Sequence, residues 1–197
     1  CEAKITKLTE ASTSVNDLEG REYPATEIDI GSPAIDRGSY VNALSVTFLL
    51  LDNPANDTGV IDTVEIWVHT AFPGAAVGTL YLDSGTDYIG RDYESIGFVT
   101  SGSKQTFTGL DIDVEAGDYI GSYVSTGRLE RDAYGYAGWR FNFSGKAWSG
   151  GYTSFDTLLS GETLSLYGTG ETTAILPTVT TQAATNITHS SARLPYN

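Results

Sequence analysis

The chain is poor in several residue types on which common functions depend. Its 197 residues include one cysteine, at position 1, two histidines and no methionine. A disulfide within the chain needs two cysteines, so none can form, and zinc–thiolate or cysteine–histidine chemistry lacks its side chains. A Gly-x-Ser-x-Gly nucleophile elbow and a His-Glu-x-x-His motif are both missing. We therefore predict that the chain is not an enzyme, although two of its 25 acidic residues could form the carboxylate pair of a glycosidase.

Positive charge is also scarce. Lysine and arginine total 11, and the formal net charge is −14. Nucleic-acid phosphates are bound by clustered lysines and arginines, so we expect no nucleic-acid partner. The acidity favours a soluble protein of an extracellular or saline setting, and bound calcium or a cationic partner is the alternative. The longest apolar run, Val46 to Leu51, is far shorter than the roughly 18 residues that span a membrane.

The first residue allows two interpretations. The chain shows neither an initiator methionine nor a signal peptide, so we expect it to be processed or cut from something longer. Mature bacterial lipoproteins begin with a cysteine that carries the lipid, which would make Cys1 a lipid anchor. The alternative is that Cys1 marks an arbitrary fragment boundary.

The stretch from residue 110 to 124 indicates the fold class. Aliphatic and acidic residues alternate over 110–115, which is the period-two pattern of a strand with one buried and one wet face. Residues 116–118, Ala-Gly-Asp, have the composition of a turn. Residues 119–124 then begin a second strand, with aliphatic side chains on one face and tyrosines on the other. We predict that this stretch is the central hairpin of an antiparallel β-sandwich.

Segments of strand length recur about every 10 residues along the chain, and none shows helical periodicity. The strands are expected at 27–30, 44–51, 62–69, 77–82, 94–99, 103–110, 139–144 and 163–167, with an edge strand or loop at 127–132. The final Leu-Leu-Leu of 44–51 suggests burial on both faces. Together they predict an all-β fold, an antiparallel β-sandwich of jelly-roll type, for residues 21–170. Residues 1–20 are expected to form an extended N-terminal arm, and 171–197 a C-terminal arm.

Aromatic residues supply the best candidate binding site. Flat, rigid rings on a sandwich face or loop can stack on sugar rings, while neighbouring polar groups bond the hydroxyls. Trp139, Phe141 and Phe143 alternate with polar residues, so we assign these three to the core. The candidate glycan-binding residues are those in glycine-rich loops or opposite an aliphatic face: Trp67, Tyr134, Tyr136 and Trp148.

Two loops group oxygen ligands of the kind that calcium accepts. Their side chains are Asp52, Asn53, Asn56, Asp57, Asp83 and Asp87. The spacing fits no EF-hand, and contacts that cap turns explain such loops as well. Apart from possible calcium, we expect no cofactor. Three Asn-x-Ser/Thr tripeptides, at Asn56, Asn142 and Asn186, match the N-glycosylation pattern, which also arises by chance.

Two resemblances extend this interpretation. Pro177-x-Val179-x-Thr181, the turn 184–188 and Ser191-Ala-Arg-Leu194 resemble the first two strands of a fibronectin type III-like repeat, although Pro195-Tyr-Asn197 departs from its pattern. This resemblance implies a longer, modular parent protein. Most of 40–170 is similar to uncharacterised β-sandwich modules of bacterial surface and phage structural proteins, on the residues 61–67, 102–107, 110–113, 116–121 and 165–170. It implies a surface or virion context and no chemistry.

The expected function is therefore a non-catalytic structural or adhesive module of an extracellular surface filament, another cell-surface assembly or a virion. Such a module would associate with itself or with neighbouring domains through its strand arms and sandwich faces. An interdomain linker is the alternative explanation of the arms. A carbohydrate-binding module that stacks glycans on its aromatics is the second hypothesis, and a glycan-active enzyme the third.

Overall fold

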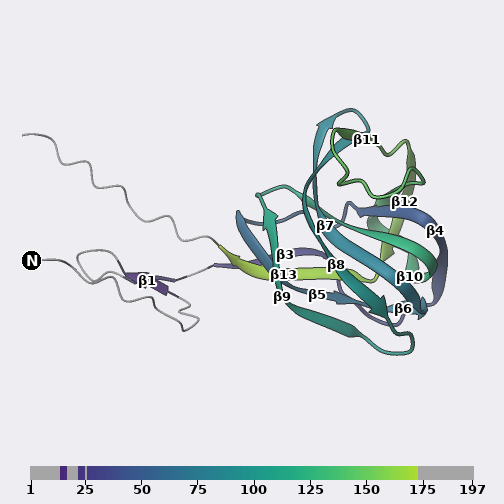
Figure 1. Ribbon diagram of the computed structural model, residues 1–197, viewed down its shortest axis with the longest axis horizontal. Coiled ribbons are helices and arrows are strands. Elements are labelled where there is room, and N and C mark those ends of the chain that lie inside the picture. Colours follow the sequence, from purple (N-terminus) through teal and green to yellow (C-terminus); the bar gives the residue numbers. More distant parts are fainter. Residues whose placement is uncertain (1–13, 17–21, 25, 173–197) are drawn as a thin grey trace, which may run out of the picture.

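The computed structural model describes residues 14–16, 22–24 and 26–172, and these contain no helix (Figure 1). Two antiparallel sheets form a sandwich, which confirms the predicted all-β fold. The four-stranded sheet has the order β3 (Glu27–Ser32), β13 (Leu166–Thr172), β5 (Gly59–Ile66) and β9 (Gln105–Val114). The seven-stranded sheet has the order β11 (Tyr152–Ser154), β8 (Asp87–Val99), β7 (Phe72–Ser84), β10 (Tyr119–Asn142) and β12 (Thr157–Leu164), with β4 (Ser39–Leu50) and β6 (Val68–Thr70) also paired to β10. Two short strands, β1 (Ser14–Asn16) and β2 (Glu22–Pro24), pair with each other.

Strand β10 organises the larger sheet. It is 24 residues long, and its two ends pair with the same residues of β4. Residues 47–49 of β4 lie opposite 121–123 and also opposite 140–142, so β4 runs between two parts of β10. The sheet is therefore strongly curled, as Figure 1 shows at β4 and β10.

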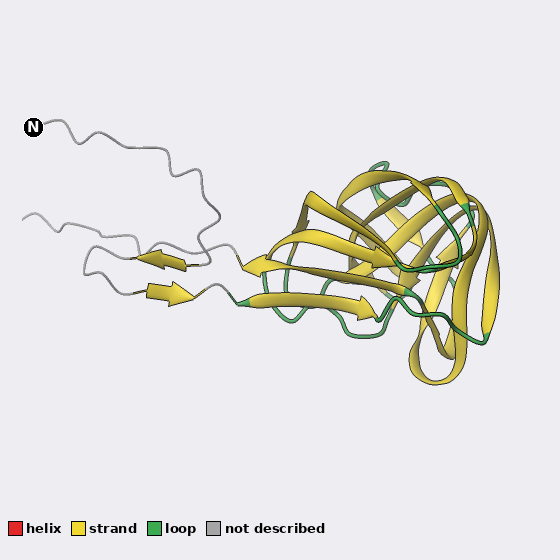
Figure 2. Cartoon of the chain, turned by 90° about the horizontal axis from the view of Figure 1, so that it is seen from below, coloured by secondary structure: helices red, strands yellow, loops and turns green. Residues whose placement is uncertain are grey.

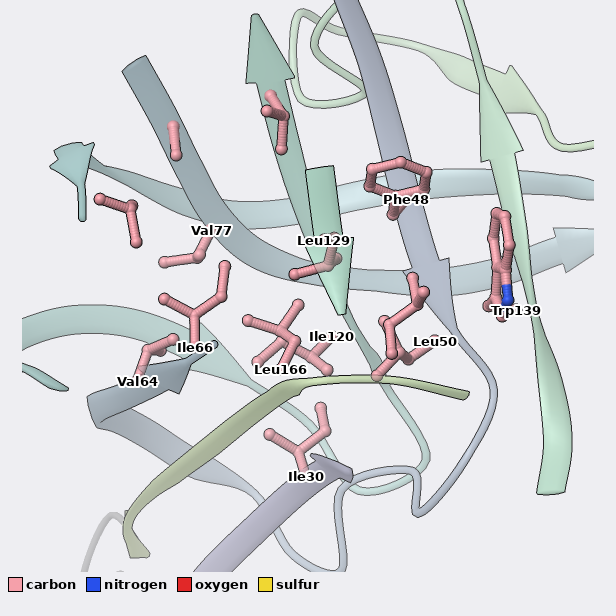
Figure 3. Packing of buried hydrophobic residues seen from close by; sticks show 14 of the residues in the cluster. Ile30, Phe48, Leu50, Val64, Ile66, Val77, Ile120, Leu129, Trp139 and Leu166 are labelled. Atoms are coloured by element: carbon pink, nitrogen blue, oxygen red, sulfur yellow. The ribbon is translucent and has the colours of Figure 1, made fainter. Parts of the chain in front are cut away.

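The main core lies between the sheets and is aliphatic, with Phe48, Phe72 and Trp139 as its large rings (Figure 3). Leu49 and Leu50 are both fully buried but belong to different clusters, which confirms burial on both faces of β4. Leu49 belongs to a second cluster with Leu80, Tyr88, Ala147 and Phe155. The segment 143–156 therefore covers part of the outer face of the seven-stranded sheet.

The predicted central hairpin is wrong, because β9 and β10 lie in different sheets. The expected faces are nevertheless present, since Ile112, Val114, Ile120 and Val124 are buried. The turn between the strands is closed by the buried Asp118, whose carboxylate accepts hydrogen bonds from the Glu115 N–H and from Arg91. The pKa of Arg91 is raised, first by its hydrogen bond to Asp118. A turn held this way crosses from one sheet to the other.

Three further expectations need correction. The predicted strands at 62–69 and 163–167 each change sheet in the middle, at Trp67 and at Ser165. The Trp67 N–H donates to the Ser165 carbonyl, so the two crossings lie together. Residues 127–132 are an interior part of β10 rather than an edge strand or loop. Trp139 and Phe141 do pack in the core, but Phe143 follows the end of β10 and is 64% exposed.

Side chains close both edges of the four-stranded sheet. At β3, the amide of Asn56 accepts from the Asp29 N–H and donates to the Glu27 carbonyl, and the Asn53 carbonyl accepts from Gly31 N–H. At β9, Glu94 and Asp92 of β8 accept from two consecutive outward N–H groups, those of residues 111 and 113. These contacts take the hydrogen-bonding positions that an added strand would need.

The first and last strands of the sandwich begin and end side by side. Glu27 of β3 lies opposite Glu171 of β13, and the Thr172 N–H donates to the Thr26 carbonyl. Figure 2 shows both strands at one end of the sandwich. No helix in the described part of the chain could span a membrane.

Candidate functional site

Residues 133–138, which we call the tyrosine loop, are a bulged part of strand β10 rather than the loop between strands that their glycines predicted. Between residues 133 and 139 the register with β12 slips twice, so β10 has more residues here than β12 can pair. Gly135 and Gly138 have φ angles of 93° and 118°, and Tyr134 has a φ of 88°. A positive φ costs a residue with a Cβ atom about 1–2 kcal/mol, because Cβ approaches the following carbonyl oxygen.

Tyr134 also projects into solvent, with 88% of its surface exposed. An aromatic side chain in this position buries almost no apolar surface, so its own packing does not offset the backbone strain. Strain of this kind persists only where the surrounding structure imposes it, and it is common at binding sites. The combination of strain and exposure distinguishes Tyr134 from every other aromatic residue in the described part of the chain.

Hydrogen bonds fix the end of the tyrosine loop. The Ala137 N–H donates to Asp52 Oδ1 at 2.6 Å, and the Gly138 carbonyl accepts from the Leu51 N–H at 3.0 Å. Gly138 also allows a close approach, since a methyl group there would meet the Leu159 carbonyl oxygen and Leu158. The loop is therefore anchored to both β4 and β12.

Arg37 supports the other side of the tyrosine loop. Its side chain is 1% exposed and donates to Ser32, Pro33, Asp132 and Ser165 at 2.7–3.0 Å, and to the Tyr136 hydroxyl at 3.4 Å. The guanidinium carbon lies 5.6 Å from the centroid of the Tyr136 ring. A guanidinium has five N–H donors, and five acceptors surround this one. Arg37 thus joins β3, β10 and the sheet crossing at Ser165.

Further apolar side chains lie around the tyrosine loop. Tyr136 and Leu158 remain 38% and 42% exposed, and Ile35, two residues before Arg37, is exposed as well. Tyr136 is paired with Gly161 of β12, and Leu158 reaches Gly138, so both border the loop. A rigid, exposed aromatic group beside an exposed sheet edge can hold a ligand or a neighbouring chain at little cost in conformational entropy.

The four predicted aromatic residues do not form one site. Tyr134 and Tyr136 share the tyrosine loop, but Trp148 packs elsewhere, on the outer face of the seven-stranded sheet. Its ring lies over Gly78, Gly90 and Gly121 of three adjacent strands, and its N–H donates to the Thr79 carbonyl. Trp67 is half-buried at the crossing between β5 and β6.

Trp148 belongs to a second aromatic group. Its ring stacks on Tyr93 at a centroid distance of 5.5 Å, and Lys146 Nζ lies 5.4 Å from the Tyr93 ring and 5.7 Å from the Tyr123 ring. Tyr93 is 39% exposed. We call Tyr93, Tyr123, Lys146 and Trp148 the aromatic platform.

The candidate calcium ligands mostly bond the protein itself. Asn53 and Asn56 bond β3, and Asp57 accepts from the Thr58 N–H. Asp52 accepts from the tyrosine loop, and its second oxygen is buried without a protein partner. Asp83 accepts from Ser84, and the backbone of Asp87 lies opposite Ser154 where β8 pairs with β11. Over the described residues, no three His, Cys, Asp or Glu side chains come together as a metal site.

Sequence reasoning missed a polar cluster on β6. His69 has no partner on β10 and forms a β-bulge, and its Nδ1 lies 2.9 Å from Oε1 of Glu130. The Glu130 side chain is 3% exposed, and its other oxygen has no protein partner. Tyr40 stacks on His69 at 4.3 Å, and Arg128 lies over Tyr40 at 4.6 Å. A lone glutamate in a charged stretch gave no signal that it would be buried.

The comparisons with known proteins give no relative. No family model, curated protein or solved structure matches the chain. Several expectations concern residues outside the described part of the chain and remain predictions. They are the fibronectin-like segment, Cys1, and the two arms at 1–20 and 171–197, of which only residues 14–16 and 171–172 are described.

Proposed function

We propose that this chain is a non-catalytic structural or adhesive module of an extracellular surface assembly or a virion. It engages its neighbours through the tyrosine loop and the edge of β12 beside it. The observation that carries the proposal is Tyr134, an aromatic residue that is strained and exposed on a loop anchored from both sides. Packing of the Tyr134 side chain within the chain does not offset the backbone strain, whereas contact of the ring with a partner would offset it.

The way the chain leaves the sandwich supports this role. Because β3 begins beside the end of β13, both connections to the rest of the chain emerge at one end. The tyrosine loop belongs to the other sheet, which leaves it accessible when the ends are attached to further segments. The acidic surface, with a formal net charge of −14, keeps such a module soluble outside cells.

A carbohydrate-binding module is the second candidate, and the aromatic platform favours it. The stacked rings of Tyr93 and Trp148 place aromatic side chains on the outer face of the sheet, with Tyr93 39% exposed, and Lys146 over the Tyr93 ring can donate to sugar hydroxyls. This platform is separate from the tyrosine loop, so the two candidates can be tested by different substitutions.

The test is retention of labelled full-length chain on two surfaces, one carrying the immobilised wild-type chain and the other a printed glycan array. We expect retention on the immobilised chain, reduced at least about tenfold by Tyr134→Ala. Tyr152→Ala is the matched control, because Tyr152 is 67% exposed on β11 and has an ordinary φ. The proposal is contradicted if both substitutions reduce retention equally, or if Tyr134→Ala does not reduce retention at all. Retention on glycans that Tyr93→Ala removes would transfer the function to the aromatic platform.

A further inference from the structure

The outer edge of β12 differs from the other long edges of the sandwich. Side chains close β3 and β9. The outer edge of β8 pairs with β11 only at residues 87–89 and then carries Arg91 and a kink at Gly97. The unpaired part of β4 is interrupted by Ser45, which has a φ of 47°. Charges and irregular backbone are the features by which proteins protect exposed strands.

β12 shows less of this protection. Within residues 26–172, it pairs with β10 along one edge, and no strand pairs with the other. Its segment 157–160, Thr-Leu-Leu-Ser, carries no charge, and Leu158 and Ser160 are exposed. The first positive φ of the strand, 80°, comes only after this segment, at Gly161. An exposed, uncharged strand edge of this kind pairs readily with a further strand.

The sequence of residues 173–197 complements this edge. These 25 residues contain no aspartate or glutamate and one arginine, Arg193, in a chain whose net charge is −14. They are rich in threonine and include Ile175, Val179 and Ile187, and all three residue types favour strands. A segment without acidic residues can approach the acidic sandwich without the repulsion that two sandwiches would experience.

The length and starting point of this segment indicate whose edge it reaches. It begins after Thr172, at the far end of β13 from the Ser165 crossing where β12 ends, and Figure 1 shows the end of β13 directed away from β12. Fully extended, 25 residues span roughly 80 Å, at about 3.3 Å per residue. That reach is long enough to meet the edge of a neighbouring copy, and the direction in which β13 ends favours that copy over the segment's own sandwich.

We infer that residues 173–197 of one copy add a strand to the outer edge of β12 of a second copy. The inference rests on the proposed function and names the neighbour. Main-chain hydrogen bonds to β12 hold the added strand, and Leu158 and Tyr134 contact its side chains. Repeated from copy to copy, this head-to-tail contact builds a filament or a ring.

The experiment measures the mass of the full-length chain by light scattering over a range of concentrations. We expect oligomers that dissociate on addition of an excess of a synthetic peptide with the sequence of residues 173–197. Leu158→Lys should raise the dissociation constant at least about tenfold, because a lysine blocks pairing at a strand edge. Ser160→Lys should do the same, and it serves as the second edge variant if Leu158→Lys does not fold. Leu82→Lys is the matched control, since Leu82 is 49% exposed at the end of β7.

A chain that stays monomeric at every concentration overturns the inference. So do oligomers that persist in the presence of the peptide or in the folded edge variants. If the chain is retained on its own immobilised copies and loses this retention on Tyr134→Ala, but the peptide does not dissociate the oligomers, this inference fails while the proposed function stands.

Discussion

Replacing Tyr134 by glycine should stabilise the protein, although it removes a large side chain. The side chain is 88% exposed, so its loss removes little buried surface. The φ of 88° is strained for tyrosine and ordinary for glycine, which is worth about 1–2 kcal/mol. Glycine also increases the entropy of the unfolded chain, which offsets about 0.4–1 kcal/mol of this stabilisation. The expected net gain is about 0.5–1 kcal/mol.

The decisive comparison is between Tyr134→Gly and Tyr134→Ala. Both remove the ring, but alanine keeps the Cβ atom that causes the strain. Tyr134→Gly should therefore be the more stable variant by about 0.5–1 kcal/mol in urea unfolding, and its Tm should be about 1–4 °C higher. Both variants should lose the partner equally. If alanine proves as stable as glycine, the loop is not strained and the reasoning from strain to function fails.

Two further predictions concern groups that hold the sandwich together. Arg37→Met should cost about 3–5 kcal/mol of unfolding free energy, because it leaves the buried acceptors around the guanidinium without donors. Arg128 is more exposed, so Arg128→Met should cost less than about 1 kcal/mol. Equal effects of the two substitutions in urea unfolding would contradict the role of Arg37. Burial raises the pKa of Tyr88 above its ordinary value of 10.0, so the folded state holds the phenol proton more tightly than the unfolded state. That stability is fully present below about pH 10 and is lost as the pH rises further. Tyr88→Phe should therefore flatten the fall of Tm above about pH 10, and an unchanged slope relative to wild type would refute this.

Most strands of this fold were predictable, but β11 and residues 157–162 of β12 were missed, and the assignment of strands to sheets was not predictable. In the expected strand 62–69, the alternating Val64, Ile66 and Val68 all lie in the interior. The same pattern continues through Trp67, where the chain leaves one sheet for the other, because both sheets face the same core. Alternation of apolar and polar residues indicates which face of a strand is buried, but it does not indicate which strand lies beside it.

The candidate site was partly predictable for the same reason. Glycine-rich sequence around Tyr134 and Tyr136 indicated an exposed loop, and the structure shows exposed residues in a bulged part of β10 instead. Arg37 gave no signal, since its acceptors come from segments far apart in the chain. The packing of Trp148 could not be predicted either, because its ring lies over three glycines on three different strands. Long-range contacts of this kind leave no local pattern.

The adjacent ends of β3 and β13 determine how the module would respond to force. A pull on the two connections would act at the Glu27–Glu171 pair and peel the strands apart from that end. In this geometry the main-chain hydrogen bonds are loaded one after another, whereas strands pulled from opposite ends load all of theirs together. Under tension, β3 would therefore separate from the sandwich at low force and add length to the chain. Pulled in this way, the sandwich would extend rather than behave as a rigid link.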